Sequence, residues 1–139
     1  HARPLRPSPR WVMASPDYVA RRGAPESVED LAGHELLGFT QPESLNVWPL
    51  RHAGGSSYLA VPTLATSSGE TQRQLEVRGV GIACLSDFVV REDVKAGRLV
   101  KLMAAAHTDY LQPMHAVYHR NTQLSRRIAC FLDFFATRI

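Results

Sequence analysis

Three hydroxyl side chains and a glycine stand side by side in this sequence, and together they could hold an anion: Thr66, Ser67, Ser68 and Gly69. Ser67 can cap a helix that starts here, and Glu70, three positions on, completes a capping box of the S-x-x-E kind. The first amides of a helix lack partners within it, and the helix dipole adds partial positive charge beside them. A carboxylate at this helix start would be stabilised by both effects. The alternative is an ordinary helix cap that binds nothing.

The residues around this run predict a strand, a helix and a second strand. Residues 63–66 form the first strand, and the helix ends near Gly79, because glycine readily takes the left-handed conformation that terminates helices. Residues 80–85, VGIACL, are continuously apolar, which is typical of a strand buried on both faces. This order implies a parallel sheet, and such sheets bind ligands at the carboxyl ends of their strands.

A second helix and a third strand complete the unit. Ser86 or Asp87 caps the helix, Gly97 ends it, and the apolar residues 99–103 resume the strand pattern. Both helices start where strands end, so their amides face the edge at which a ligand is expected. Residues 66–69 are therefore the leading candidate for a binding element.

The start of the chain predicts an extended segment followed by a helix. Residues 1–10 contain three prolines, which block a helix and favour an extended connection. A short apolar strand at 11–15 follows. Ser15, Pro16 and Gly23 then have the types expected at the cap, the first position and the end of a helix.

The next stretch predicts a short helix, a strand and a surface hairpin. The helix begins at Ser27, whose S-x-x-D pattern places Asp30 in the first turn, and a strand is expected at 34–40. Two weakly alternating runs then flank Gly54 and Gly55, which favours a hairpin over these glycines.

The last third predicts a loop, a strand and an amphipathic helix. Residues 101–113 lack a clear period and end in proline, so a loop is expected there, followed by a strand at 114–119. Residues 124–139 place leucine, isoleucine and phenylalanine on one broad helical face, which needs a partner surface. Association of two chains through this helix is one consequence.

Composition excludes several classes of protein. The 139 residues suit one domain of ordinary size, with 45% hydrophobic and 21% charged residues. No apolar stretch approaches the ~20 residues that cross a bilayer, and no secretory signal is recognisable, so a cytoplasmic location is expected. The net charge of +3 is mild and its arginines are scattered, which does not indicate a nucleic-acid groove.

The sequence gives little support for a catalytic nucleophile or a metal site. Cys84 lies among apolar neighbours, without the base and the electropositive setting that a catalytic thiol needs. Neither Ser67 nor Ser86 lies in a G-x-S-x-G elbow. His115 and His119 share a face of the expected strand but lie too far apart along it for one ion. The sequence predicts no catalytic residue, no metal ligand and no cofactor.

Six segments carry a family resemblance, in the order ASPDYVARRG, SVEDLAGHELLGF, a lone tryptophan at position 48, SSGETQRQLEVRGVGIACLSDFVVREDVKAGRLV, MHAVYH and SRRIACFLDFF. In order and spacing they resemble the effector-binding region of LysR-type transcriptional regulators. The resemblance extends over residues 5–135. No single motif is specific, and the combination carries the comparison.

The resemblance implies an α/β fold of the type II periplasmic-binding-protein kind, with a mixed, mostly parallel sheet flanked by helices. Two lobes joined by two crossover strands would close on a small molecule. Residues 1–10 are then a crossover segment from the first lobe, 11–113 the second lobe, and 114–139 the return strand and final helix of the first lobe. The rest of that lobe and a winged helix-turn-helix would lie outside this chain, as in a fragment.

Three residues near the implied cleft need separate attention. Ser86 stands where the family commonly has proline, and it offers a hydroxyl to a ligand or to the helix cap. Trp11, at the first crossover, places a large ring near the cleft, where it either selects the effector or packs. Phe88 has the same two alternatives, because large aromatic side chains are mostly packing residues.

The function implied is effector sensing by a transcription regulator. Its partners would be a small organic acid and a second copy of the chain, with DNA bound only by the helix-turn-helix part and no contact with a membrane. One alternative is a solute-binding protein of a transporter, which would require export. The other is a small α/β hydrolase or transferase that uses Ser67 or Cys84.

Overall fold

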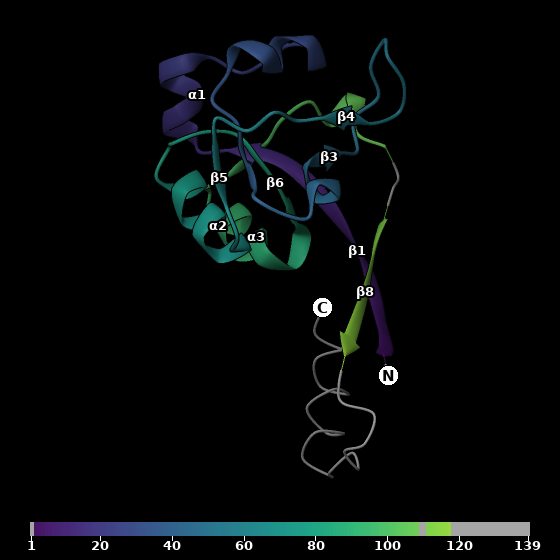
Figure 1. Cartoon of the computed structure of the whole chain (residues 1–139). Coiled ribbons are helices and arrows are strands. Elements are labelled where there is room, and N and C mark those ends of the chain that lie inside the picture. The colour runs from purple at the N-terminus through teal and green to yellow at the C-terminus, as the bar shows by residue number, and fades with distance from the viewer. Residues whose placement is uncertain (1, 109–110, 118–139) are drawn as a thin grey trace.

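The computed structural model describes residues 2–108 and 111–117, with side chains for residues 8–108. Figure 1 shows a body of short strands covered by helices, from which β1 and β8 project as a ribbon. The elements, in chain order, are β1 (Ala2–Ala14), α1 (Pro16–Arg22), η1 (Val28–Gly33), β2 (Leu37–Phe39), η2 (Glu43–Asn46), β3 (Val47–Trp48), β4 (Tyr58–Leu59), β5 (Leu64–Thr66), α2 (Gly69–Val77), β6 (Ala83–Ser86), α3 (Asp87–Lys95), β7 (Val100–Lys101), η3 (Ala104–Ala106) and β8 (Leu111–Val117). The elements marked η are 3-10 helices.

The first strand, β1, is longer than expected. The extended segment at 1–10 and the strand at 11–15 are one continuous strand, which pairs antiparallel with β8 and then with β6 and β7. Its proline residues fit because their fixed φ is compatible with an extended chain. The ladder with β8 is irregular between Leu5 and Ser8, where Pro7 has no N–H to donate.

The sheet is mixed, which confirms the expected α/β class. Its parallel part consists of β5, β2 and β6: Phe39 pairs with Thr66, and Leu36 forms a parallel bridge with Ile82. All three pairings of β1 are antiparallel, so the antiparallel share is larger than the sequence suggested. The hairpin over Gly54 and Gly55 is confirmed as β3 and β4.

The strand predicted to be buried on both faces is confirmed by two apolar clusters. Ile82 and Cys84 pack in one cluster with Tyr18 and Trp48. Ala83 and Leu85, the alternate residues, pack in the other cluster, which receives side chains from α2 and α3. The period of two along β6 therefore sends successive side chains into different cores.

The first helix follows its sequence signals closely. The Ser15 hydroxyl accepts a hydrogen bond from the Tyr18 amide at 3.1 Å, Pro16 is the first helical residue and Gly23 has φ of 78°. The capping box of Ser27 and Asp30 is also confirmed, although it opens a 3-10 helix. Gly79, with φ of 83°, ends the α2 region beside α1, where an added Cβ would lie 3.2 Å from Asp17 Oδ2.

Two expectations for the last third differ in outcome. The predicted loop at 101–113 is wrong at both ends, because β7 includes Lys101 and β8 begins at Leu111 and runs through Pro113. Pairing with β1 supplies the hydrogen bonds that a loop would lack. The amphipathic helix at 124–139 lies outside the described residues. Within the described part, no helix is both long and apolar enough to cross a membrane.

Candidate functional site

The candidate binding residues meet at one edge of the sheet. Phe39 and Thr66 are paired, and the bridge between Leu36 and Ile82 sets β6 parallel to β2, so the carboxyl ends of β5, β2 and β6 share this edge. β1 crosses the same edge, because Trp11 pairs with Leu85 on β6. The fold thus brings the segment at 66–69 and the start of α3 to the edge that Trp11 crosses.

The start of α2 differs by one residue from its predicted form. Ser68, not Ser67, caps the helix, with its Oγ accepting from the Thr71 amide at 3.2 Å. Glu70 does not complete a capping box, since its carboxylate contacts Arg73 on the next turn. Thr66 uses its hydroxyl in the turn, donating to the Ser68 carbonyl at 2.8 Å and accepting from the Ser68 amide at 3.2 Å.

These contacts leave a small set of donors at the helix start. Ser67 is exposed, and no described residue engages its hydroxyl. Because Ser68 and Thr66 satisfy the amides of Thr71 and Ser68, the amides of Gly69 and Glu70 are left without a backbone acceptor in the described chain. A free hydroxyl beside two free amides is a suitable site for one carboxylate group.

The two aromatic candidates differ: Trp11 packs against other side chains, whereas Phe88 is exposed. The Trp11 indole N–H donates to Asp87 Oδ1 at 3.2 Å, and its ring lies 4.5 Å from the His107 ring and 3.8 Å from Lys101 Nζ. These contacts favour the packing alternative for Trp11. Phe88, on the first turn of α3, is 36% exposed and remains accessible.

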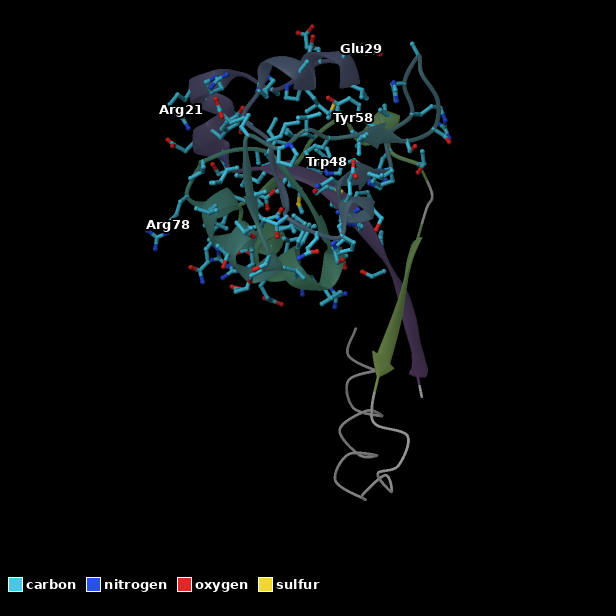
Figure 2. The ribbon with its side chains drawn as sticks, in the orientation of Figure 1. Arg21, Glu29, Trp48, Tyr58 and Arg78 are labelled. Carbon is cyan, nitrogen blue, oxygen red and sulfur yellow. The ribbon has the colours of Figure 1, made fainter. Side chains whose placement is uncertain are left out.

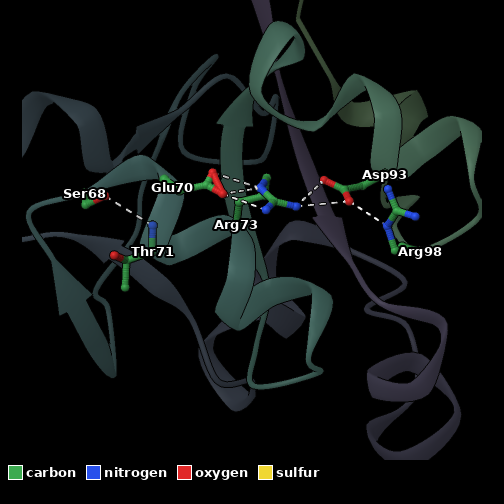
Figure 3. A network of polar contacts seen from close by, with 6 residues as sticks. All are labelled: Ser68, Glu70, Thr71, Arg73, Asp93 and Arg98. Carbon is green, nitrogen blue, oxygen red and sulfur yellow. Dashed lines mark hydrogen bonds and ion pairs between the residues drawn. The ribbon is translucent and has the colours of Figure 1, made fainter.

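An ion-pair network holds α2 against α3 beside this edge (Figure 3). Arg73 contacts Glu70 at 2.6 Å and Asp93 at 3.0 Å, and Arg98 contacts Asp93 at 2.7 Å. Burial raises the pKa of Asp93, but hydrogen bonds from Arg98 and Arg73 outweigh it, so the net pKa is lowered. The hydrogen bond from Arg73 likewise lowers the pKa of Glu70. The lowered pKa values keep the Glu70 and Asp93 carboxylates charged at neutral pH, so the ion pairs between α2 and the end of α3 persist there.

The inner face of α2 carries two polar side chains without partners. Gln72 and Glu76 are fully buried, and their side-chain oxygens and the Gln72 nitrogen have no hydrogen-bond partner among the described residues. Burial raises the pKa of Glu76 well above its usual range, which the nearby Ala83 backbone only partly offsets. Burial therefore favours the neutral form of the Glu76 carboxyl group.

A cavity of about 730 Å³ opens beside the hairpin and next to this edge, since Arg10 in its wall pairs with Ser86 at the end of β6. Its wall includes Trp48, which lies inside the body, whereas Arg21 and Arg78 lie on the outer surface (Figure 2). Ten of the described residues line the cavity: Arg10, Ser44, Leu45, Val47, Trp48, Pro49, Arg51, Ser56, Ser57 and Thr108. The sequence did not predict this cavity, because its walls come from segments far apart in the chain. The available signal was Arg10, which shares a strand face with the apolar Val12 and Ala14.

The structure also bears on the nucleophile and metal alternatives. Cys84 is buried, and burial raises the pKa of its thiol to about 12, so the reactive thiolate is not formed at neutral pH. Among residues 8–108, whose side chains the structure describes, no group of three or more metal-ligating side chains is present. His119 lies outside the described residues.

Comparisons with known proteins give consistent results. A family model for the LysR substrate binding domain matches residues 1–139. The chain is 45% identical over 128 residues to the HTH-type transcriptional regulator CrgA of Neisseria meningitidis serogroup C, covering 92% of this chain and 43% of CrgA. It is 31% identical to the uncharacterized HTH-type transcriptional regulator YhjC of Escherichia coli, covering 97% of this chain and 46% of YhjC. The chain thus spans less than half the length of these relatives.

Solved structures agree with the sequence relatives. The regulatory domain of CrgA from Neisseria meningitidis has a TM-score of 0.89 at 44% identity, covering 99% of this chain and 68% of that chain. The regulatory domain of AphB from Vibrio vulnificus, at 22% identity and a TM-score of 0.68, covers 100% and 69% and shares the fold alone. The fold is thus of the type II periplasmic-binding-protein kind, and these relatives are regulators. The chain belongs to the LysR-type transcriptional regulators, in which it forms part of the substrate-binding, or effector-binding, domain.

Proposed function

We propose that this domain binds a small acidic metabolite at the carboxyl edge of its sheet and that occupancy modulates DNA binding by another part of the full-length protein. The observation that carries the proposal is the start of α2, where the Ser67 hydroxyl and the amides of Gly69 and Glu70 have no partners among the described residues. Thr66 and Ser68 shape the turn, while Phe88 supplies an apolar contact nearby. Trp11 orients Asp87 at the same edge.

The proposed cleft lies between two lobes. Residues 11–113 form the second lobe, residues 1–10 are the crossover from the first lobe, and residues 114–139 return to it. In support, β1 and β8 leave the body side by side as one antiparallel ribbon (Figure 1). A ligand held at the edge would then contact both lobes.

The proposed mechanism requires no chemical step. A ligand that contacts both lobes binds one closure angle more tightly than others, and this difference in affinity shifts the population of closure angles. In a regulator that pairs with a second copy of its own chain, the shift changes how the DNA-binding parts are placed. The curated relatives are named as regulators rather than enzymes, which supports this reading.

The test uses the full-length protein and a thermal-shift screen of organic acids. A bound acid raises the melting temperature, and Ser67→Ala is expected to reduce that shift by removing one hydrogen bond to a charged group, which contributes about 1.5–3 kcal/mol. Thr71→Ala is the matched control, because Thr71 is exposed on the same helix one turn further on. Equal shifts in wild type and Ser67→Ala would count against this site.

A further inference from the structure

Both ring nitrogens of His107 contact carbonyl oxygens. Nδ1 lies 2.8 Å from the Thr108 oxygen, and Nε2 contacts the Arg10 oxygen. A carbonyl oxygen only accepts hydrogen bonds, and a neutral imidazole has one N–H and one bare nitrogen. A neutral ring would therefore place one nitrogen lone pair against an oxygen lone pair. Only the imidazolium ring, with a proton on each nitrogen, can donate to both carbonyls.

These contacts lie at the base of the ribbon, where β1 enters the body (Figure 1). β1 pairs with β8 up to Pro9, and from Arg10 on it pairs with β6. His107 belongs to the segment between β7 and β8, where an isolated bridge to Leu50 holds its backbone. The imidazole therefore ties the segment that leads into β8 to the residue at which β1 leaves β8.

The His107 ring also lies against Trp11, the residue that follows Arg10 on β1. The two ring centroids are 4.5 Å apart, with 33° between the ring planes. An indole ring attracts a neighbouring cation, so the charged form of His107 stabilises this contact more than the neutral form does. The charged side chains on the elements around the ring are Arg10 on β1, Arg51 beside the Leu50 bridge, Lys101 on β7, and Asp87 and Arg91 on α3. Asp109 lies outside the described residues.

We infer that His107 is a positioning residue whose protonation determines how firmly the ribbon is joined to the body. With both nitrogens protonated, the ring donates to the carbonyls of Arg10 and Thr108 and lies on the Trp11 ring. Loss of one proton leaves a donor for only one of the two carbonyls. Histidine side chains change charge between about pH 5 and pH 8, so mild acid strengthens the joint and mild alkali weakens it. The inference goes beyond effector binding, because it needs no ligand and uses no residue at the start of α2.

The first experiment measures Trp11 fluorescence in the full-length protein, without added ligand, from pH 5 to pH 8. The Trp11 emission is the difference between the protein and its Trp11→Phe variant. A protonated imidazole quenches a neighbouring indole more strongly than a neutral one, so this emission should fall as the pH falls. His107→Gln keeps an amide donor but cannot titrate, and its emission should stay constant. His34→Gln is the matched control, because His34 is also half-buried but contacts the Tyr18 hydroxyl, not a carbonyl.

Hydrogen exchange of the same proteins measures how firmly the ribbon is held. At pH 6, amides in residues 2–9 and 111–117 should be protected about tenfold more in wild type than in His107→Gln, as for one hydrogen bond from a charged group. At pH 8 the two proteins should be equally protected. Comparing them at each pH cancels the intrinsic pH dependence of exchange and any titration elsewhere in the chain.

NMR of the ring nitrogens, in wild-type protein labelled in histidine, tests the protonation without any substitution. At pH 5 both nitrogens of His107 should give the signals of N–H groups. The inference is overturned if one nitrogen stays bare at that pH, if Trp11 emission does not change with pH, or if its change persists in His107→Gln. A difference in ribbon protection that is equal at pH 6 and pH 8 would also overturn it, because a purely structural contact would not depend on protonation.

Discussion

At the scale of single residues, α2 shows that polar side chains can face a core. Gln72 and Glu76 lie one turn apart on the buried side of the helix, at positions where an amphipathic pattern would place apolar residues. Neither side chain has a hydrogen-bond partner in the described chain, so both lose their contacts with water without replacement. Burial of these two side chains without partners is expected to lower the free energy of unfolding, and a substitution on this helix face can measure that effect.

Glu76→Gln is expected to stabilise the protein near neutral pH. Burial raises the pKa of Glu76 in the folded state, so the folded protein binds more protons than the unfolded chain once the pH exceeds the ordinary carboxyl pKa. Wild-type stability therefore falls as pH rises from that value towards the folded pKa, at a slope of up to about 1.4 kcal/mol per pH unit. The glutamine variant has no such proton to lose, and its stability should lack this slope.

Urea unfolding between pH 5 and pH 8 measures this difference. Glu29→Gln is the control, because Glu29 is exposed on η1 (Figure 2). A wild-type slope identical to that of Glu76→Gln would show that Glu76 is not a buried neutral acid.

At the scale of elements, α2 and α3 are held together by charge. Asp93, only 3% exposed in its side chain, sits between Arg73 of α2 and Arg98, which follows α3. Glu70 extends the network along α2 (Figure 3). Ser67 and Ser68 lie at the start of the same helix, so the network anchors the helix whose first amides belong to the proposed binding site.

Asp93→Asn is expected to destabilise the fold by about 1–3 kcal/mol, because it removes charged hydrogen bonds and leaves Arg73 without its buried partner. The pKa of Asp93 is lowered in the folded state, so its contribution is present above the unfolded pKa and is lost as pH falls through the folded pKa. Chemical unfolding at pH 7 and pH 3 measures both effects. Glu92→Gln, a change at an exposed neighbour on α3, should have little effect. Equal stability of Asp93→Asn and wild type at pH 7 would show that the network does not fix α2.

At the scale of the whole molecule, the body and the ribbon are described by different kinds of contact. The body is packed around two apolar clusters, one on each face of β6. The ribbon is described only as the paired backbones of β1 and β8. If β1 and β8 are the crossovers of a two-lobed protein, ligand binding should act on them.

Hydrogen exchange of the full-length protein tests this arrangement. A saturating organic acid is expected to slow the exchange of amides in residues 2–9 and 111–117, because closure of the lobes restricts the ribbon. Amides of β6 should change little and provide the internal control. Protection confined to the α2 start would mean that the ligand binds there without coupling to the crossover.

Local signals in the sequence determined much of the fold. Ser15, Pro16 and Gly23 specified α1, because caps and prolines act through neighbouring backbone groups. The apolar run at 80–85 specified a strand buried on both faces, and Gly54 and Gly55 specified the hairpin. These features depend on residues close together in the chain.

Only the tertiary structure decided the rest. Whether Ser67 or Ser68 caps α2 depends on the turn that Thr66 makes at the end of β5; both are serines, a type that N-caps favour, and the S-x-x-E pattern pointed to Ser67. Trp11 was ambiguous until His107 and Lys101 were found beside its ring. The positions of Arg10 and Glu76 could not follow from hydrophobic pattern, because burial of a charged residue depends on which distant backbone groups surround it. The proposed edge site could be predicted from the sequence because its residues are contiguous, whereas the cavity forms only where distant segments of the chain meet.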